Sequence, residues 1–278
     1  MAETDILERM ERLAHRRETP CGRGTMVWRR WGQGRPVVLL HGGSGSWMHW
    51  VRTIPALMGR FEVWAPDLPG LGDSAMPDDP PTPETAAQAV VAGFRAIFDD
   101  GRKPDLVGFS FGAHVGTVAA SMLGNALRSF TLSGSAALGL PHRKLDFARE
   151  RTGMSAAERN DVHRANLEML MFADPARIDA LAVRIQAENI AKARFKSRAF
   201  APTDGIRRRL PDLPMPVHAL WGEHDNIADG DVAGRIALLQ ALRPGLHARI
   251  VPGAGHWAAY EQARHYSALL CELLDLPV

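Results

Sequence analysis

The sequence has 278 residues, a formal net charge of +2, and a composition that is 46% hydrophobic and 23% charged. This length is enough for one large α/β domain or two smaller ones, and the composition is ordinary for a soluble globular protein. The small net charge gives no reason to expect nucleic acid or an anionic membrane as a partner.

Membrane, secretion and disulfide signals are not found in the sequence. The longest apolar runs have about ten residues, too few to span a bilayer. The N-terminus lacks the apolar stretch of a secretory signal. Cys21 and Cys271 lie far apart without a CxxC motif and are expected to be unpaired thiols. We therefore expect a cytoplasmic protein with no membrane partner.

The first expected element is an amphipathic helix over residues 4–17. Its apolar side chains recur at helical spacing with charges between them, at Ile6, Leu7, Met10 and Leu13. The apolar stripe is expected to dock either on the body of the protein or on a partner chain, and the second case would make a homodimer.

Strands then alternate with helices along most of the chain. The strands are predicted over residues 25–31, 36–40, 61–65, 105–109, 127–133, 216–221 and 248–251. The helices are predicted over residues 83–98, 111–124 and 260–274. Most of the strands are continuous apolar runs, as in sheets that are covered on both faces. The pattern predicts an α/β fold with a doubly wound, mostly parallel sheet.

The stretch from residue 139 to residue 210 interrupts this alternation. It shows helical patterns over residues 156–172 and 178–195 and no strand pattern. We expect an all-helical cap, or lid, over the carboxyl ends of the strands, with residues 1–138 and 211–278 as the core. The stretch carries 15 Lys and Arg and 9 Asp and Glu, a net charge of +6. This excess either attracts an anionic substrate or belongs to solvated helix faces.

A G-x-S-x-G pattern, Gly108-Phe109-Ser110-Phe111-Gly112, follows a predicted buried strand and begins a predicted helix. A serine at such a corner is held in a sharp, strained turn, and only small residues two positions away let the neighbouring backbones pass. The pattern predicts that Ser110 is a nucleophile. The alternative is a Gly-rich turn that holds a serine by chance, so a base and an acid are needed.

His256 is the expected base for Ser110, because a serine hydroxyl needs a base that is itself oriented by an acid. Of the 11 histidines, it lies in a Gly-rich loop between the last strand and the last helix, at the sheet edge of Ser110. The stretch after strand 216–221 offers Glu223 and Asp225, and Asp225 is the expected acid. The resulting order along the chain, Ser–Asp–His, is that of the nucleophile-elbow hydrolases.

The oxyanion of a tetrahedral intermediate needs backbone N–H donors. One is expected from Phe111, directly after the serine at a helix start. The other is expected from Gly43, in the Gly-rich loop after strand 36–40, with Ser44 as the second choice. Ser44 and Phe109 are also expected to border the substrate. The loop matches neither G-x-G-x-x-G nor G-x-x-x-x-G-K-[ST], so no nucleotide site is expected.

Together these motifs resemble the α/β-hydrolase-fold serine hydrolases. The matching stretches, in chain order, are VVLLHGGSGS, APDLPGLGDS, LVGFSFGAHVG, LWGEHD and PGAGHW. In that family the second stretch is architecture, so Asp67, Gly70, Gly72 and Ser74 are expected to shape a turn beside the site. The resemblance implies a small-molecule substrate, no metal and no organic cofactor.

The cap stretch LEMLMFADPARIDALAVRIQ is similar to the lid of meta-cleavage-product hydrolases, which break carbon–carbon bonds in vinylogous diketo acids. In that group an arginine shortly past an Asp-Pro-like turn binds the substrate's carboxylate, and Arg184 falls there. A tryptophan follows the catalytic histidine, as Trp257 does here. Phe109 and Ser46 stand where that group usually has Asn and Pro, and Phe109 cannot hydrogen-bond a dienol.

Three functions are therefore open. The favoured one is hydrolysis of a small, carboxylate-bearing ester, thioester or lactone by Ser110, His256 and Asp225. The second is carbon–carbon bond hydrolysis of the meta-cleavage-product type. The third is a binding protein that has kept the fold without catalysis. A serine nucleophile argues against the dehalogenase and soluble epoxide hydrolase branches, which use Asp at this position.

Overall fold

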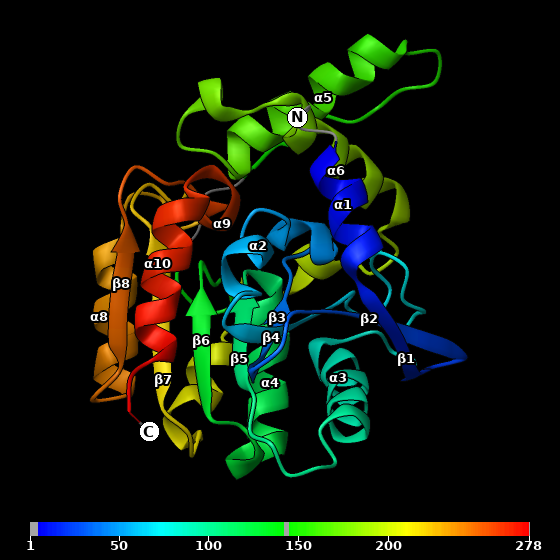
Figure 1. Ribbon diagram of the computed structural model, residues 1–278. Coiled ribbons are helices and arrows are strands. Elements are labelled where there is room, and N and C mark those ends of the chain that lie inside the picture. Colours follow the sequence, from blue (N-terminus) through cyan, green and yellow to red (C-terminus); the bar gives the residue numbers. More distant parts are fainter. Residues whose placement is uncertain (1–4, 142–144, 278) are drawn as a thin grey trace.

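Eight strands form one sheet in the computed structural model, which describes residues 5–141 and 145–277 (Figure 1). They are β1 (His15–Cys21), β2 (Gly24–Trp31), β3 (Arg35–Leu40), β4 (Phe61–Pro66), β5 (Asp105–Phe109), β6 (Ser129–Ser133), β7 (Val217–Gly222) and β8 (His247–Val251). The order across the sheet is β1-β2-β4-β3-β5-β6-β7-β8. β2 pairs antiparallel with β1 and β4, and the other neighbours are parallel. The predicted mostly parallel sheet is confirmed.

Helices cover both faces of the sheet, as predicted. The α-helices are α1 (Asp5–Leu13), α2 (Ile54–Leu57), α3 (Pro83–Ile97), α4 (Phe111–Leu123), α5 (Ala156–Leu170), α6 (Ala180–Lys192), α7 (Gly205–Arg209), α8 (Val232–Leu242), α9 (Ala258–Glu261) and α10 (Ala263–Leu274). Successive residues of a strand point to opposite faces. Val38 and Leu40 of β3 thus join a core with α3, α4 and α8, whereas Val37 and Leu39 join one with α1, α2 and α10.

Strand β1 is the largest departure from the sequence-based expectation. Residue 4, where the expected helix over residues 4–17 would begin, lies outside the described residues. The observed helix α1 ends at Leu13, and residues 15–21 form the sheet edge instead. Only Thr19 and Cys21 of β1 are buried. The strand therefore lacks an apolar alternation that sequence reading could detect, and its exposed charges are typical of a protected sheet edge.

Helix α1 docks on the body of its own chain, which is one of the two expected arrangements. Leu7 and Met10 are buried in the same core as Trp31. The Trp31 Nε1–H also donates to the Met10 carbonyl oxygen over 2.7 Å. The docking explains why an amphipathic pattern is present at this end of the chain.

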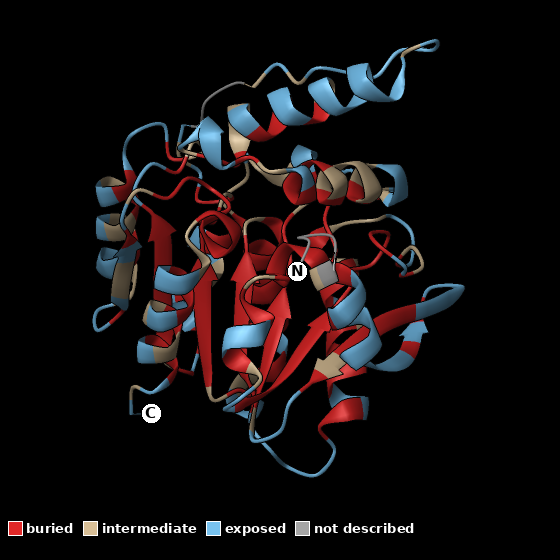
Figure 2. Cartoon of the chain, turned by 45° about the horizontal axis from the view of Figure 1, so that its top comes forward, coloured by how far each residue is buried: buried red, intermediate tan, exposed pale blue. Residues whose placement is uncertain are grey.

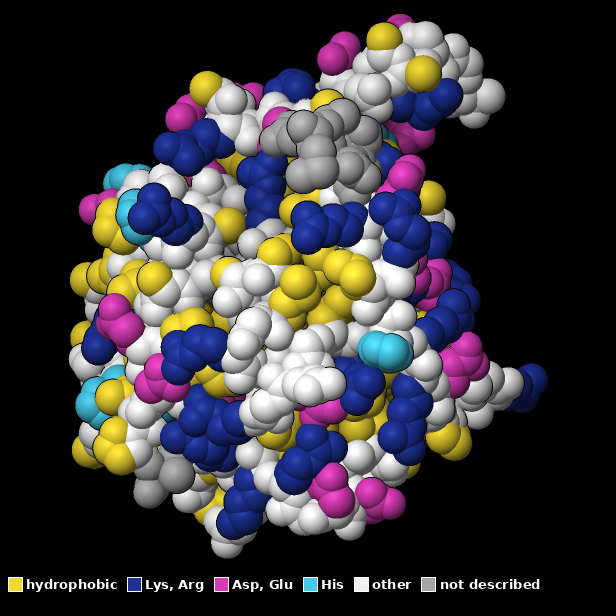
Figure 3. Space-filling model, in the orientation of Figure 1, with side chains coloured by type: hydrophobic (Ala, Val, Ile, Leu, Met, Phe, Trp, Pro, Cys, Tyr) yellow, Lys and Arg dark blue, Asp and Glu magenta, His cyan; other side chains and the backbone are white. Residues whose placement is uncertain are grey.

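The described part of the chain between β6 and β7, called the helical segment below, consists of helices and loops and contains no strand. Besides α5, α6 and α7 it contains the 3₁₀ turns η3 (Pro175–Arg177), η4 (Ser197–Phe200) and η5 (Leu210–Asp212). α5 and α6 lie beyond the carboxyl ends of the parallel strands, and α5 is mostly exposed (Figures 1 and 2). In the space-filling view, which has the orientation of Figure 1, this part of the chain projects at the top of the molecule (Figure 3). Helix α7 contacts α4. Among the described helices, none is both long enough and apolar enough to cross a membrane.

Candidate active site

Ser110 occupies a strained corner between β5 and α4. Its backbone has φ 51° and ψ −115°, a left-handed conformation that non-glycine residues rarely adopt. A Cβ on Gly108 would lie 2.5 Å from the carbonyl oxygen of Gly112, and one on Gly112 would lie 2.4 Å from the carbonyl oxygen of His41. The prediction that this corner requires small residues on either side of Ser110 is therefore confirmed.

The structure brings Ser110, His256 and Asp225 into one hydrogen-bonded row. His256 Nε2 lies 3.0 Å from Ser110 Oγ. His256 Nδ1 lies 2.9 Å from each carboxylate oxygen of Asp225. Because a carboxylate only accepts, Nδ1 carries the proton and Nε2 is left to accept the serine hydroxyl proton. The His256 and Asp225 side chains are almost fully buried, which keeps water from competing for these contacts.

Neighbouring strands bring the acid and the base together. β7 and β8 are paired up to Gly222 and Val251, so the loops that follow them leave the same sheet edge. Gly134, just after β6, has φ 51°, and a Cβ there would lie 3.0 Å from Asp225 Oδ2. Gly134 was not among the predicted site residues, although a Gly directly after a predicted strand is a recognisable signal.

Glu261 holds the loop of His256 against the helical segment. Its carboxylate, which is almost fully buried, accepts hydrogen bonds from the backbone N–H groups of Gly255, Ala173 and Asp174, at 2.6–3.0 Å. In addition, the N–H of Trp257 donates to the carbonyl oxygen of Met171. Glu261 was not among the predicted site residues, because its partners Ala173 and Asp174 are backbone groups far away in the chain.

The Gly-rich loop after β3 passes directly over Ser110. A Cβ on Gly42 would lie 3.3 Å from the Cβ of Ser110, and one on Gly43 would lie 2.3 Å from Ser197 Oγ in η4. Ser44 has φ 48°. Phe111 is the first residue of α4, where backbone N–H groups have no partner within the helix. The two residues expected to supply the oxyanion donors lie close together, because a Cβ on Gly43 would lie 3.5 Å from the Cβ of Phe111.

Two buried histidines hold this loop. Burial, together with the nearby His41 and His256 rings, lowers the pKa of His49 well below its ordinary value. The neutral ring accepts a hydrogen bond at Nδ1 from the N–H of Gly42. The His41 Nδ1–H donates to the carbonyl oxygen of Gly42, and Nε2 accepts from the N–H of Leu68. The loop is therefore fixed before any substrate arrives.

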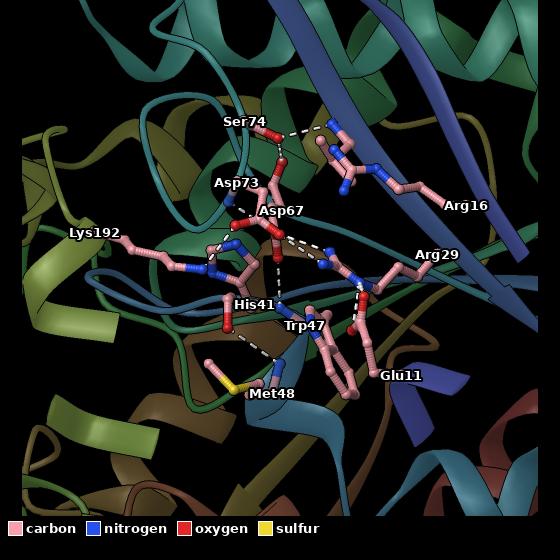
Figure 4. A network of polar contacts seen from close by, with 12 residues as sticks. Glu11, Arg16, Arg29, His41, Trp47, Met48, Asp67, Asp73, Ser74 and Lys192 are labelled. Carbon is pink, nitrogen blue, oxygen red and sulfur yellow. Dashed lines mark hydrogen bonds and ion pairs between the residues drawn. The ribbon is translucent and has the colours of Figure 1, made fainter. Parts of the chain in front are cut away.

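The stretch 67–74 shapes a turn beside this loop, as predicted. Gly70 and Gly72 both have positive φ. The Asp67 carboxylate accepts hydrogen bonds from the N–H of Trp47 at 2.8 Å and from Arg29 Nη1 at 3.0 Å, as Figure 4 shows. The Asp67 carbonyl oxygen accepts from Ser74 Oγ. Asp67 thus ties the turn to residues that directly follow the Gly-rich loop.

A cavity of about 760 Å³ opens at Ser110. The sequence-predicted residues that line it are Gly43, Ser44, Phe109, Ser110, Phe111 and His256. Its apolar part is supplied mostly by the helical segment, with Phe147, Val162, Leu170, Met171, Ile190 and Phe200. Phe109 packs against the His256 ring with ring centres 4.9 Å apart. The cavity therefore has room for an organic substrate whose reacting carbonyl would lie beside Ser110.

The structure does not bring Arg184 or Trp257 to this cavity. Arg184 pairs with Glu188 one turn later in α6, at 2.7 Å, and lines a second cavity of about 550 Å³ beside α1. Trp257 is buried, stacks on Tyr260 and donates its Nε1–H to the carbonyl oxygen of His49. The acidic and basic residues that line the Ser110 cavity, among those that the structure describes, are instead Asp146, Arg149, Glu150 and Arg198.

The two thiols and the possible metal ligands of the described residues show no second reactive centre. Cys21 and Cys271 are free, and burial raises the pKa of Cys21 to about 11, which makes its thiol unreactive. Within the described residues, no group of three or more His, Cys, Asp or Glu side chains is arranged to hold a metal ion.

Known proteins resemble this chain over most of its length. The Alpha/beta hydrolase family matches residues 37–266. A 2-hydroxy-6-oxo-6-(2'-aminophenyl)hexa-2,4-dienoic acid hydrolase of Metapseudomonas resinovorans is 26% identical over 247 residues, which cover 85% of this chain and 82% of that protein. A pimeloyl-[acyl-carrier protein] methyl ester esterase of Edwardsiella ictaluri is 28% identical over 268 residues, covering 90% and 97%.

Solved structures agree in fold. A carboxylesterase from Bacillus subtilis superposes with a TM-score of 0.75, at 16% identity, over 99% of this chain and 98% of that one. Identity this low supports the fold alone. The predicted resemblance, to a group that includes both meta-cleavage-product hydrolases and esterases, is confirmed by these relatives.

Proposed function

The chain belongs to the alpha/beta hydrolase family and is a hydrolase, and on that premise we propose that it is a serine hydrolase of small carboxylic esters, thioesters or lactones. The observation that carries the proposal is the hydrogen-bonded row from Ser110 through His256 to Asp225, which ends at a cavity large enough for a substrate. A non-catalytic binding protein would need neither the strained serine nor its two partners.

The proposed reaction begins with attack of Ser110 Oγ on the carbonyl carbon. His256 Nε2 takes the hydroxyl proton, and Asp225 stabilises the resulting imidazolium. The N–H groups of Gly43 and Phe111 then stabilise the negative oxygen of the tetrahedral intermediate. When the intermediate collapses, the bond to the leaving oxygen or sulfur breaks, and His256 returns the proton to that atom.

A water molecule completes the cycle. His256 takes a proton from the water as the water oxygen attacks the acyl carbon, and returns it to Ser110 when the ester to the enzyme breaks. The products are a carboxylic acid and an alcohol or thiol, or one hydroxy acid from a lactone. Because hydrogen bonds to His41 and His49 hold Gly42 in place, the oxyanion donors need little rearrangement during these steps.

We also propose that the helical segment between β6 and β7 acts as the cap expected over residues 139–210. It supplies most of the apolar lining of the Ser110 cavity. Its turn at residues 171–174 is bonded to the loop of His256 through Glu261. An apolar roof of this kind excludes water, which strengthens the electrostatic contacts inside the site.

Carbon–carbon bond hydrolysis is the second candidate, because one of the relatives is named as a dienoic acid hydrolase. Phe109 argues against it. The Phe109 ring lies against His256 and offers no hydrogen bond to a dienol at this point of the cavity. The ester reaction needs no polar group there.

A substrate panel distinguishes the two reactions. The kcat/KM of the purified protein would be measured for short p-nitrophenyl esters and for a vinylogous 1,5-diketo acid. We expect hydrolysis of the esters to be faster, and a preference for the diketo acid would favour the second candidate. Failure on both classes, together with no covalent reaction at Ser110, would refute the proposed function.

A further inference from the structure

We propose that the Ser110 cavity recognises substrates by a carboxylate held between Arg149 and Arg198, where residues 145–150 meet η4. This inference rests on the proposed function, since it names the substrate class of the same cavity. The carboxylate would be bound by Arg149 and Arg198 of the helical segment, and not by Arg184 as expected from the sequence.

The first observation is that both guanidiniums lack a carboxylate partner. Arg149 and Arg198 line the Ser110 cavity, and neither forms an ion pair within the part of the chain that the structure describes. The two acidic residues beside them are engaged differently: Glu150 bonds to His163 Nε2 at 2.9 Å, and Asp146 is exposed. Two unpaired cations on one cavity wall are complementary to an anion.

The second observation is that both arginines are carried by anchored residues. Arg149 stands between Ala148, whose N–H and carbonyl oxygen are both bonded to the buried Asn166 side chain, and Glu150, which is bonded to His163. The Arg198 guanidinium lies over the Phe147 ring, 3.7 Å from its centre. Stacking of this kind fixes the guanidinium plane and leaves its N–H edge available.

The two arginines are close enough for their charges to interact. Desolvation and the positive charge of Arg149 together lower the pKa of Arg198. An anion between the two guanidiniums would relieve this repulsion and would accept N–H donors from both. The main support for a carboxylate site is that both arginines line the cavity and are unpaired within the described residues, and the repulsion between their charges is additional support.

The position of Arg198 connects this anion site to the reacting centre. Arg198 directly follows Ser197, whose Oγ abuts Gly43 in the loop over Ser110. Phe147, Ser197 and Phe200 line the same cavity. A substrate with its reacting carbonyl at Ser110 and its carboxylate at Arg198 would therefore stay within one cavity, with its apolar chain on the phenylalanine rings.

The test compares two substrates that differ only in this charge. They are p-nitrophenyl hydrogen glutarate, which keeps a free carboxylate, and its methyl ester, which is neutral. Arg149→Met and Arg198→Met should each lower the kcat/KM of the charged ester by about tenfold more than that of the neutral one. The effect is moderate because water screens charges at an exposed rim. The loss should shrink as NaCl is added.

Arg208→Met is the matched control, because Arg208 is an exposed arginine of the same segment that pairs with Asp204 and lines neither cavity. It should not change the ratio of the two kcat/KM values. Equal losses on both substrates in the Arg149 and Arg198 variants would overturn the inference. So would a selective loss in Arg184→Met alone, because the carboxylate would then lie in the second cavity.

A binding measurement separates this inference from the proposed function. Calorimetry on Ser110→Ala needs no catalysis, and glutarate should bind more tightly than neutral glutaramide. Adding Arg149→Met and Arg198→Met should remove the difference. If glutaramide binds equally well, or if inorganic phosphate binds as well as glutarate, the carboxylate site is refuted even where esters are hydrolysed. If the esters are not hydrolysed but glutarate is selected, only the proposed function fails.

Discussion

Two cavities border the loop that follows β3, and they differ in how their charges are paired. The cavity at Ser110 touches residues 42–44, and the cavity beside α1 touches residues 46–48. In the second, every charged lining residue has an opposite charge within ion-pair distance. In the first, Arg149 and Arg198 have none within the described residues.

Arg29 and Arg198 show how ion pairing decides the role of an arginine. Arg29 is buried and bonds to three carboxylates, those of Glu11, Asp67 and Asp73, so it joins the N-terminal helix to the turn beside the site (Figure 4). Arg198 is exposed and rests on an aromatic ring. Pairing makes a charge part of the scaffold, whereas an unpaired charge at a cavity is available to a ligand.

The largest effects are expected when the reacting groups of the Ser110 cavity are removed. Ser110→Ala and His256→Ala should each lower kcat by roughly 10⁴- to 10⁶-fold, because nucleophile and base act as one unit. The double variant should be little worse than either single one. Steady-state kinetics with a p-nitrophenyl ester measures this, and unchanged circular dichroism shows that the fold is kept. Substantial activity in His256→Ala would mean that the base has been misassigned.

Asp225→Asn should have the next largest effect, a loss of roughly 10⁴ in kcat, since an amide favours the wrong imidazole tautomer. Glu223→Gln is the matched control. Glu223 is exposed, accepts the N–H of Gly253 at the loop edge and lies 3.7 Å from His224 Nε2. Its replacement should leave kcat within a few-fold, and the reverse pattern in the two variants would reassign the acid.

Replacing the paired Arg29 or the unpaired Arg198 tests whether ion pairing stabilises the fold. Arg29→Met should lower the free energy of unfolding by about 3–5 kcal/mol, because it leaves the buried Asp67 carboxylate without its cation. Arg198→Met should change it by less than about 0.5 kcal/mol, as is usual for an exposed residue. Urea unfolding measures both. Similar values for the two variants would show that the pairing in the second cavity does not stabilise the fold.

The smallest effect is expected from Asp73 at acid pH. Burial alone would raise its pKa, but hydrogen bonds from Lys192 and Arg29 lower that pKa to about 2. A depressed pKa stabilises the folded state above the ordinary value near 4, and this stabilisation is lost as the pH falls towards 2. It amounts to about 2 kcal/mol, of which roughly half is lost by pH 3.

Asp73→Asn should remove this acid dependence. Its free energy of unfolding, measured by urea between pH 6 and pH 3, should be lower than that of the unaltered protein at pH 6 and should approach it at pH 3. Parallel curves for the two proteins would contradict the assigned role of the carboxylate.

The sequence predicted most of the sheet and the residues of the candidate triad, because these depend on local patterns. Continuous apolar runs marked the central strands, and the small residues at positions 108 and 112 marked the corner that positions Ser110. Chain order then placed Asp225 and His256 at the same edge. Strand β1 was not predicted, because its polar sequence lacks a strand pattern. It forms a strand because it pairs with β2 at the edge of the sheet.

The orientation of helical side chains could not be predicted in the same way. Arg184 lies in α6, whose buried face carries Leu181, Ala182 and Ile185. Which cavity the remaining positions reach depends on how the helix packs against α1 and the β3 loop. Glu261 and His49 were missed for a related reason, since their roles are hydrogen bonds to backbone groups that only the folded chain brings near.

Covalent labelling with an alkyl fluorophosphonate, followed by peptide mass spectrometry, tests directly whether Ser110 is a nucleophile activated by His256. We predict one adduct, on Ser110, formed rapidly in the unaltered protein and far more slowly in His256→Ala. We also predict that Arg29→Met, if folded, still labels at Ser110. A folded protein whose Ser110 stays unlabelled, or an adduct on a different serine, would contradict this assignment of the nucleophile.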